Sequence, residues 1–445
     1  MAKDFLTLED FKNLRGKTVL LRVDLNSPIE KGRIIFNKRF EAHAKTVSLL
    51  LSKGAKIVVL THQGRLGDDN CISLKQHAAL LSKLCGKKIF LDGDRQVVGE
   101  KTLSSIKKLK SGQAMLLENL RFLKEEAEEK QPEEHARGKI VAALVPLADL
   151  FVNDAFSNSH RSHGSMVGFP AVMVSCAGPV LAAEVEGALK AREHAKRPNV
   201  YVLGGSKPKE AIELMEYVLK KSIVDKILTC GVIGELCLIA RGNGLSAGTM
   251  NELRKEGHTS LMLPLRDLIH QYHEFIETPF DFAVDEGGVR KEFLLTSIMQ
   301  HEAPIGDIGI KTSNKYSKII LKSKTVYIKG PPGKYEQNIF ENGTRAILTA
   351  AANSSAYTLL GGGHSGAAAE KLGIPLSKFS YISLSGGALE KFMQGKPLVA
   401  VSALEKSKEK FGAKLGAKKM PAEEKLPSAH VPVHKTKQSK LHAKK

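Results

Sequence analysis

The chain is 445 residues long, with 42% hydrophobic residues, 39 glycines and a formal net charge of +20. This length allows two or three domains, and the composition is typical of a soluble, loop-rich α/β protein. The longest apolar stretch, residues 140–152, is too short to span a bilayer, and the N-terminal residues lack the apolar core of a signal peptide, so neither a membrane protein nor a secreted one is expected.

The cysteines and the basic charge indicate the cellular compartment and the kind of partner. The five cysteines show no CxxC pair and no metal-ligand spacing, which indicates reduced thiols and a cytoplasmic location. The basic excess favours anionic partners, namely phosphorylated metabolites, nucleic acid or an acidic surface. Residues 405–445 carry twelve Lys against four Glu, a net charge of +8, and little apolar periodicity. We therefore expect a disordered tail at 405–445, which is either a solvated extension or an arm that binds polyanions weakly.

Short aliphatic runs alternate with amphipathic patterns in the first half of the chain. The expected strands are residues 18–25, 56–62, 88–91, 114–120 and 150–154. The run at 18–25 is unusual, because Arg22, Asp24 and Asn26 follow one another at a two-residue spacing and so share one face of a strand. This pattern fits a solvated edge strand, and it equally fits a buried strand that delivers polar groups to a site at its end.

The second half repeats the alternation. Its expected strands are residues 199–205, 225–231, 325–330, 357–363 and 379–387, and a long helical pattern at 179–198 separates the two halves. Strand–helix alternation predicts parallel sheets that are covered by helices on both faces. The expected fold class is therefore α/β, with two Rossmann-like domains at 1–178 and 199–385 joined by a connecting helix.

Charged side chains accumulate where the first-half strands end. Ligands of open parallel sheets bind at the carboxyl ends of the strands. These ends, together with the start of the helix that follows the first strand, hold Arg22, Arg39, His62, Arg65, Arg121 and Arg161. A single surface Arg or hydrogen-bonded His needs no function, but guanidinium groups gathered in one place bind phosphate and carboxylate in a bidentate way. The cluster predicts a site for a small ligand with several negative charges.

The second-half strands end in glycine. Gly-rich turns occupy residues 203–210, 230–234, 329–336, 361–366 and 383–388. Glycine lets the backbone approach a ligand closely, and N–H groups at the start of a following helix bind phosphate oxygens. None of the turns matches the P-loop or the dinucleotide fingerprint, which argues against both of those enzyme classes. The series indicates a nucleotide site, with Lys207 as the cation for the transferring phosphate.

Two ligand-binding domains joined by a helix favour a phosphotransferase that closes about a hinge. Nine motifs carry a more specific signal. They are LRVDLNSP, HQGR, LLENLRF and FVNDAFSNSHRSHGS, followed by LGGSK, DIGIKTSNKYS, KGPPGKYE, LLGGGHS and SGGALEKFMQGK. Between about residues 15 and 404, these motifs resemble those of phosphoglycerate kinases, and of the archaeal type most of all. The resemblance implies reversible phosphoryl transfer between 1,3-bisphosphoglycerate and ADP, giving 3-phosphoglycerate and ATP in glycolysis and gluconeogenesis, with Mg²⁺ on the nucleotide and hinge-bending domain closure.

The resemblance also assigns domains and site residues. It implies a 3-phosphoglycerate domain at 1–178, a hinge helix at 179–198, a nucleotide domain at 199–385 and a segment at 386–404 that returns to the first domain. The implied substrate-binding residues are Arg22, Asp24, Asn26, Arg39, His62, Gln63, Gly64, Arg65, Arg121 and Arg161. The implied nucleotide-binding residues are Gly204, Gly205, Lys207, Glu336, Gly362, Gly363, His364 and Ser365. Arg39 and Lys207 are the implied catalytic residues, and no general base is needed because the acceptor carboxylate is already ionised.

Several positions depart from the family pattern. His364 stands where many members have the Asp that holds Mg²⁺, and imidazole is a poor ligand for that ion, so the metal-binding residues stay unspecified. Lys329 replaces a common Asn. Ala211 replaces a second Lys, for which Lys209 is a candidate substitute. These changes bear on nucleotide affinity and base preference more than on the reaction.

Two other functions stay open. Cys230, Val232 and Ser385 interrupt glycine runs, which suits a catalytically inactive relative. The basic tail suits a second role in binding nucleic acid, which should weaken steeply as salt is raised. The patterns leave the oligomeric state and the choice between ATP and GTP unspecified.

Overall fold

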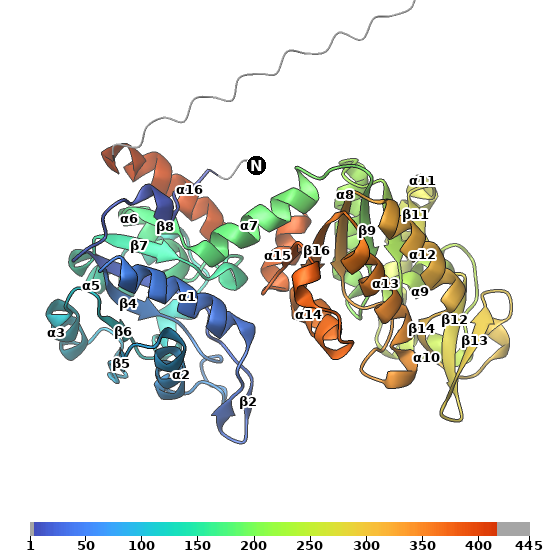
Figure 1. The fold of residues 1–445 in the computed structure, drawn as a ribbon, viewed down its shortest axis with the longest axis horizontal. Coiled ribbons are helices and arrows are strands. Elements are labelled where there is room, and N and C mark those ends of the chain that lie inside the picture. The colour runs from blue at the N-terminus through green and yellow to red at the C-terminus, as the bar shows by residue number, and fades with distance from the viewer. Residues whose placement is uncertain (1–3, 416–445) are drawn as a thin grey trace, which may run out of the picture.

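The aliphatic runs of the first half form the buried strands of a six-stranded parallel sheet. The computed structural model describes residues 4–415 (Figure 1). The strand order is β5-β6-β4-β1-β7-β8. The strands are β1 (Thr18–Arg22), β4 (Lys56–Leu60), β5 (Ile89–Leu91), β6 (Ala114–Leu116), β7 (Leu150–Asn153) and β8 (Ser175–Ala177). Successive residues of a strand point to opposite faces, so Leu20 packs into one hydrophobic layer and Leu21 into the other.

Helices cover both faces of this first sheet. They are α1 (Lys38–Ser52), α2 (Lys75–Cys85), α3 (Glu100–Lys108), α4 (Pro132–His135), α5 (Lys139–Leu144) and α6 (Phe169–Val172). Helices α1 and α2 share the core that contains Leu21, whereas α3 and α5 share the core that contains Leu20. The prediction of a parallel sheet buried on both faces is therefore confirmed for the first half.

The second half forms another six-stranded parallel sheet, in the order β11-β10-β9-β15-β16-β17. Its strands are β9 (Asn199–Leu203), β10 (Lys226–Thr229), β11 (Ile276–Glu277), β15 (Thr325–Lys329), β16 (Tyr357–Gly361) and β17 (Tyr381–Ile382). Its helices are α8 (Pro208–Lys220), α9 (Gly231–Ala240), α10 (Ala247–Lys255), α11 (Met262–Tyr272), α12 (Ile310–Lys322), α13 (Asn342–Asn353) and α14 (Gly362–Lys371). The two-domain α/β class is confirmed, and each predicted strand is present with a shorter extent.

Two antiparallel elements were not predicted. One is the sheet β13-β12-β14, formed by β12 (Asp281–Glu286), β13 (Val289–Leu294) and β14 (Ile305–Ile308), and the other is the hairpin of β2 (Ile29–Glu30) and β3 (Arg33–Ile34). The dipeptide at 287–288 that joins β12 to β13 is Gly-Gly, a known hairpin signal. β13 is mostly exposed, so it lacks the continuous apolar run by which the other strands were recognised.

Helix α7 (Pro179–Arg192) runs between the two domains, as the ribbon shows (Figure 1). The predicted hinge helix at 179–198 therefore ends earlier, and residues 193–198 form an irregular connection to β9. Nine of the fourteen residues of α7 are buried, because the helix touches elements of both domains. A helix that is packed on several sides shows little amphipathic pattern, so the sequence does not mark the end of α7 clearly.

The C-terminal segment crosses back to the first domain. After α15 (Gly387–Met393), helix α16 (Val399–Phe411) packs on α6 and β8 (Figure 1). The structure corrects the predicted start of the disordered tail, because residues 405–411 belong to α16. There Ser407 is buried and donates to the Met173 carbonyl at 3.1 Å, and Lys408 pairs with Asp4 at 2.7 Å. The remainder of the predicted tail, residues 416–445, lies outside the described residues.

Within residues 4–415, none of the helices has both the length and the apolar character needed to cross a membrane.

Candidate active site

Strand β1 lies in the centre of its sheet, paired with β4 on one side and β7 on the other. This position rules out the solvated-edge interpretation of the run at 18–25. The strand itself ends at Arg22, and Asp24 and Asn26 lie in the segment that follows its carboxyl end. The polar residues thus stand where a parallel sheet places its ligands.

Arg22 is fully buried, with 0% of its surface exposed. Its Nε donates to Ser165 Oγ at 2.8 Å, and its Nη2 lies 3.2 Å from Nδ1 of His62. The Ser165 hydroxyl in turn donates to Glu126 Oε1 at 2.5 Å. Burial lowers the pKa of Arg22 to about 10 and raises the pKa of Glu126, while their mutual attraction opposes both shifts. Arg22 was expected to touch substrate, but here it supports His62 from within the domain.

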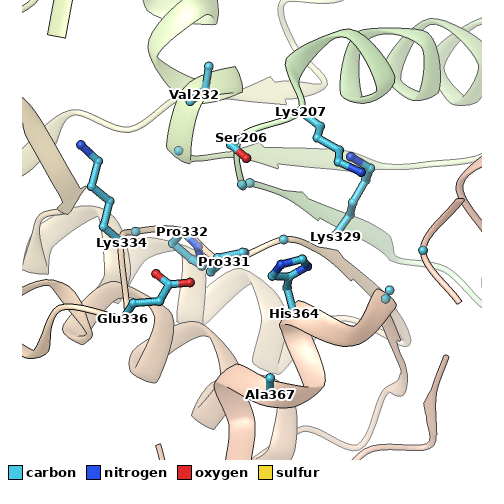
Figure 2. A pocket seen from close by; sticks show the side chains of 18 of the residues that line it. Ser206, Lys207, Val232, Lys329, Pro331, Pro332, Lys334, Glu336, His364 and Ala367 are labelled. Carbon is cyan, nitrogen blue, oxygen red and sulfur yellow. The ribbon is translucent and has the colours of Figure 1, made fainter. Parts of the chain in front are cut away.

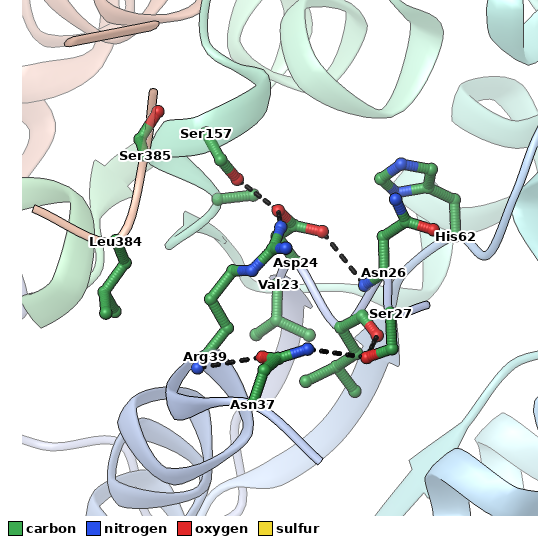
Figure 3. A network of polar contacts seen from close by, with 12 residues as sticks. Val23, Asp24, Asn26, Ser27, Asn37, Arg39, His62, Ser157, Leu384 and Ser385 are labelled. Carbon is green, nitrogen blue, oxygen red and sulfur yellow. Dashed lines mark hydrogen bonds and ion pairs between the residues drawn. The ribbon is translucent and has the colours of Figure 1, made fainter. Parts of the chain in front are cut away.

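Asp24 and Arg39 form the centre of a polar network at the end of β1 (Figure 3). Arg39 lies in the first turn of α1, which Asn37 caps by accepting from the Arg39 backbone N–H at 3.0 Å. The Asp24 carboxylate pairs with the Arg39 guanidinium and accepts from the Ser157 hydroxyl. Burial acts to raise the pKa of Asp24, but Arg39 and then His62 outweigh it and hold the pKa well below its usual range. Asp24 is therefore ionised at neutral pH and fixes the orientation of Arg39.

The turn that carries Gln63 and Gly64 is locked to the same strand end. The Gln63 side chain accepts from the Ser27 N–H and donates to the Ser27 carbonyl, both at 2.9 Å. The Asn26 side-chain oxygen Oδ1 accepts from the Gly64 N–H at 2.9 Å. Gly64 has φ +71°, and a Cβ there would lie 2.3 Å from Asn70 Oδ1, so no larger residue fits. The predicted site residues Asn26, Gln63 and Gly64 therefore hold the turn at 63–64 in a fixed shape beside the end of β1.

The remaining predicted cations of the first domain lie around this network at different depths. Arg121 is 9% exposed and its Nε has no hydrogen-bond partner within residues 4–415, whereas Arg65 is exposed. The Arg161 side chain is 50% exposed, with Nη1 3.8 Å from Glu129. Among residues 4–415, these positions leave guanidinium donors available to an anionic ligand.

Two histidines beside these arginines were not predicted as site residues. Burial, followed by the charges of Arg121 and Arg22, lowers the pKa of His163 to about 3. Burial, followed by Lys391 and Arg161, lowers the pKa of His160 to about 4. Their Nδ1 atoms have no hydrogen-bond partner within the part of the chain that the structure describes. Both stand in the motif FVNDAFSNSHRSHGS, so their positions between cations were the signal that could have identified them.

A cavity of about 1170 Å³ lies against the strand ends of the second domain and reaches the first domain; Figure 2 shows part of its second-domain wall. Arg39 and Ser157 line it from the first domain, and the glycine-rich strand ends line it from the second. The predicted nucleotide residues that line it are Gly204, Gly205, Lys207, Glu336, Gly362, Gly363 and His364. Ser365 does not, because it is buried and donates to the Gly361 carbonyl at 3.2 Å. Lys209 is exposed outside the cavity, so it does not replace the lysine that is missing at Ala211.

One end of the cavity has the features of a phosphate site. The end of β9 is tied to the end of β15, because the Gly204 N–H donates to the Lys329 carbonyl at 2.8 Å and the Gly205 N–H to the Pro331 carbonyl at 2.9 Å. A Cβ on Gly204 would lie 2.4 Å from the Pro331 oxygen, so this approach requires glycine. Helices α8 and α14 begin here without a side-chain cap, and such N-termini bind anions.

The two lysines at this end come from neighbouring strands. Lys207 follows β9 and Lys329 ends β15, and both line the cavity together with His364 (Figure 2). Lys329 is 5% exposed, and its Nζ lies 3.5 Å from Glu390 of α15. The sequence marked Lys329 as a departure but did not predict it as a site residue.

The other end of the cavity is apolar and acidic. Its apolar residues are Val232, Leu253, Pro279, Phe282 and Ile305, and its carboxyl groups are those of Glu235, Glu252 and Glu256. In Figure 2, Val232 and Lys334 lie on the side away from Lys329, and Glu336 lies below Pro332. An apolar slot of this kind suits a flat aromatic ring better than a polyanion.

Comparisons of the whole chain with known proteins point to one family of enzymes. The family model for phosphoglycerate kinase matches residues 8–396. The phosphoglycerate kinase of Pyrococcus horikoshii is 37% identical over 407 residues, which are 91% of this chain and 98% of that protein. The phosphoglycerate kinase of Thermococcus kodakarensis is 38% identical over 399 residues, which are 89% of this chain and 96% of that protein.

Solved structures agree with this match. The crystal structure of the Pyrococcus horikoshii phosphoglycerate kinase has a TM-score of 0.83 at 37% identity, and the match covers 91% of this chain and 100% of that chain. The structure of the Coxiella burnetii phosphoglycerate kinase has a TM-score of 0.76 at 32% identity, covering 90% and 98%. The chain therefore belongs to the phosphoglycerate kinase family, whose reaction is the reversible transfer of a phosphoryl group between 1,3-bisphosphoglycerate and ADP.

Proposed function

We propose that the phosphoryl group crosses the cavity between the domains, from a nucleotide on the glycine-rich strand ends to phosphoglycerate on the basic strand ends. The observation that carries this proposal is the composition of the cavity wall. Arg39 enters it from the first domain and Lys207 from the second, so both cations face one space. Two positive charges on opposite sides suit a transferring phosphoryl group, whose charge spreads over its equatorial oxygens.

The proposed chemistry requires no proton transfer. In the direction of ATP consumption, a carboxylate oxygen of 3-phosphoglycerate forms a bond to the γ-phosphorus while the bond from that phosphorus to the β,γ-bridging oxygen breaks. The acceptor is already ionised and ADP leaves as an anion, so the residues act by position and charge. Arg39, oriented by Asp24, and Lys207 are the proposed catalytic residues.

The remaining predicted substrate residues support a hinge-bending closure. Arg65, Arg121 and Arg161 do not line the cavity in this structure, although Arg39 does. Phosphoglycerate held by these three arginines would meet a nucleotide in the cavity only when the domains approach each other. Helix α7, which joins the domains, and the 383–385 segment, which is bound to Glu184 of α7, are the proposed hinge. We therefore assign 1–178 to the phosphoglycerate and 199–385 to the nucleotide.

Mg²⁺ is proposed to enter with the nucleotide as part of the substrate. Among residues 4–415, no three His, Cys, Asp or Glu side chains gather as a metal site. Mg²⁺ commonly keeps waters and substrate phosphates as ligands, which lowers the number of protein ligands it needs. The bound ion would neutralise part of the phosphate charge. The five unpaired thiols of the chain support a reducing, cytoplasmic setting.

The test is a coupled assay with 3-phosphoglycerate, ATP and Mg²⁺. We expect turnover by the parent, and a fall in kcat of about a hundredfold for Arg39→Ala and for Lys207→Ala, because each cation matters most in the transition state. Arg65→Ala, which alters an exposed cation, should act mainly through KM. Lys220→Ala at the far end of α8 is the matched control and should leave both constants unchanged. A folded parent that shows no turnover would contradict the proposal.

A further inference from the structure

Glu235 carries a buried carboxyl group that lines the cavity and has no partner in the part of the chain that the structure describes. It lies in α9, is 9% exposed and lines the apolar end. Within residues 4–415, no hydrogen bond or ion pair reaches its carboxyl oxygens. Buried carboxyl groups normally have partners, so an unpartnered one that faces a cavity points to a ligand.

The charged groups around Glu235 are occupied elsewhere or repel it. Lys334 is committed to Glu252, with its Nζ 3.1 Å from Oε2. Asp307 of β14 pairs with Arg290 at 3.0 Å and accepts from the Gly343 N–H at 2.7 Å. Burial raises the pKa of Glu235 to about 8, Lys334 acts in the opposite direction, and the negative charges of Glu252 and Glu256 add to the rise. At neutral pH the carboxyl is therefore largely protonated and offers one donor and one acceptor.

The position of Glu235 indicates which part of a nucleotide it meets. This step rests on the proposed function, in which the phosphates lie at Lys207 and Lys329. The base then extends to the opposite end, among Val232, Leu253 and Phe282. A base in this slot would place its faces against the apolar side chains, which leaves its polar edge for the carboxyl group.

We propose that Glu235 reads the hydrogen-bonding edge of the base, accepting an adenine nucleotide in its protonated form and turning toward guanine when it ionises. Adenine presents an amino donor next to the ring N1 acceptor, and a protonated carboxyl pairs with both. A carboxylate has acceptors only, so it keeps the amino group but opposes the lone pair of N1. Guanine presents two adjacent donors, N1–H and the exocyclic amino group, and a carboxylate accepts from both. Ionisation therefore weakens adenine binding relative to guanine binding.

The experiment measures the dissociation constants of ADP and GDP for the full chain by calorimetry, at about pH 6.5 and about pH 9. The two nucleotides carry the same phosphates, so phosphate ionisation cancels in the ratio of the constants. For the parent we expect the Kd of ADP divided by the Kd of GDP to rise about tenfold between the two pH values, the effect of one good hydrogen bond. Glu235→Gln should keep the low-pH ratio at both values, because an amide always has a donor and an acceptor.

A second variant acts on the environment of Glu235 without removing it. Glu252→Gln takes away a nearby negative charge and frees Lys334, so the change in the ratio should move to lower pH but persist. Glu235→Leu should bind both bases with a ratio that is independent of pH. Thermal unfolding of each variant checks that it is folded.

Two outcomes would overturn the proposal, and they differ from failure of the proposed function. A parent ratio that does not change with pH, or a Glu235→Gln ratio that changes as the parent does, removes the assignment of Glu235 while nucleotide binding stands. A folded parent that binds neither ADP nor GDP refutes the nucleotide site itself.

Discussion

Asp24 and Arg39 have different roles at the end of β1. Asp24 is almost fully buried and uses its carboxylate on Arg39, Ser157 and its own backbone segment. Arg39 is the partner that enters the cavity. The buried residue therefore orients, and the half-buried one is available to substrate. Arg22 and His62 are also in contact, but both are buried.

Asp24→Asn should lower kcat about tenfold or more, because the amide cannot hold the guanidinium by charge. The acid sensitivity of folding should change as well. The folded-state pKa of Asp24 lies below its unfolded value, so its stabilisation is present above about pH 4 and is lost as the pH falls. Chemical denaturation between acid and neutral pH should show that acidification lowers the free energy of unfolding less in the variant than in the parent. Asp267→Asn, at an exposed position on α11, is the control, and its free energy of unfolding should depend on pH as that of the parent does. The same pH dependence in all three proteins would contradict the role of Asp24.

Lys329→Met should lower kcat by about a hundredfold with a smaller change in KM, because a buried cation at the phosphate end contributes most when charge develops. Lys329→Arg keeps the charge and should recover part of the loss, which a merely structural role would not predict. Steady-state kinetics with ATP and 3-phosphoglycerate measure both. If Lys329→Met turns over normally, Lys207 alone supplies the charge on the second domain.

At the scale of elements, one buried carboxyl group links α7 to the segment between β17 and α15. Glu184 is 1% exposed, accepts from the Ser383 hydroxyl at 2.7 Å and accepts from the Leu384 N–H at 2.7 Å. Burial raises its pKa to about 7 despite these two hydrogen bonds. The segment between β17 and α15 is thus bound to a carboxyl group, that of Glu184, whose charge changes near neutral pH.

The pH dependence of stability should reveal this group. A carboxyl whose folded-state pKa is raised stabilises the fold fully below its unfolded pKa, and this contribution is lost as the pH rises through the folded value. For Glu184 the loss between about pH 4.5 and about pH 7 amounts to about 3 kcal/mol. Chemical denaturation should show that Glu184→Gln loses less free energy of unfolding over this pH range than the parent does, by this amount. Glu186→Gln, at an exposed position of the same helix, is the control and should follow the parent; a Glu184→Gln curve parallel to the parent would exclude the effect.

At the scale of the whole molecule, the chain closes on itself. Helix α16 covers α6 and β8 of the first domain, so residues near 400 complete a fold that begins near residue 4. Because α15 and α16 follow the nucleotide domain, each domain is connected to the other twice, through α7 and through residues 383–398. Two connections restrict the relative motion of the domains to a hinge more tightly than one would.

Truncation separates the helix from the basic tail. A chain of residues 1–404 loses half of α16, including Ser407 and Lys408, and should unfold at a clearly lower temperature with reduced activity. A chain of residues 1–415 should keep the unfolding temperature and the kcat of the full chain. Differential scanning calorimetry and the coupled assay compare the three chains. A stable, active 1–404 chain would show that the second half of α16 is dispensable.

The same pair of chains tests polyanion binding by the tail. If the tail binds nucleic acid, the affinity of the full chain should fall steeply with salt and exceed that of the 1–415 chain. Equal binding by both chains would assign any polyanion affinity to the folded domains.

The sequence by itself determined the alternation of strands and helices, the two parallel sheets and the residues at the strand ends. These features are local, because a run of aliphatic residues and a glycine or arginine after it can be read without knowing what lies beside them. It also determined the family, through nine motifs in order. It did not determine whether β1 was central or at an edge, since that depends on the neighbours β4 and β7.

Only the tertiary structure decided which polar residues reach the cavity. Arg22 and Arg39 look alike in the sequence, but one is buried behind His62 and the other faces the second domain. The sequence did not identify Glu235 as a functional residue, and it marked Lys329 only as a departure from the family pattern. The role of a carboxyl group on an apolar helix, or of a lysine at a strand end, depends on the groups around it in the folded protein. Burial, pairing and pKa depend on groups that are distant in the chain and close in space, and folding alone brings these groups together.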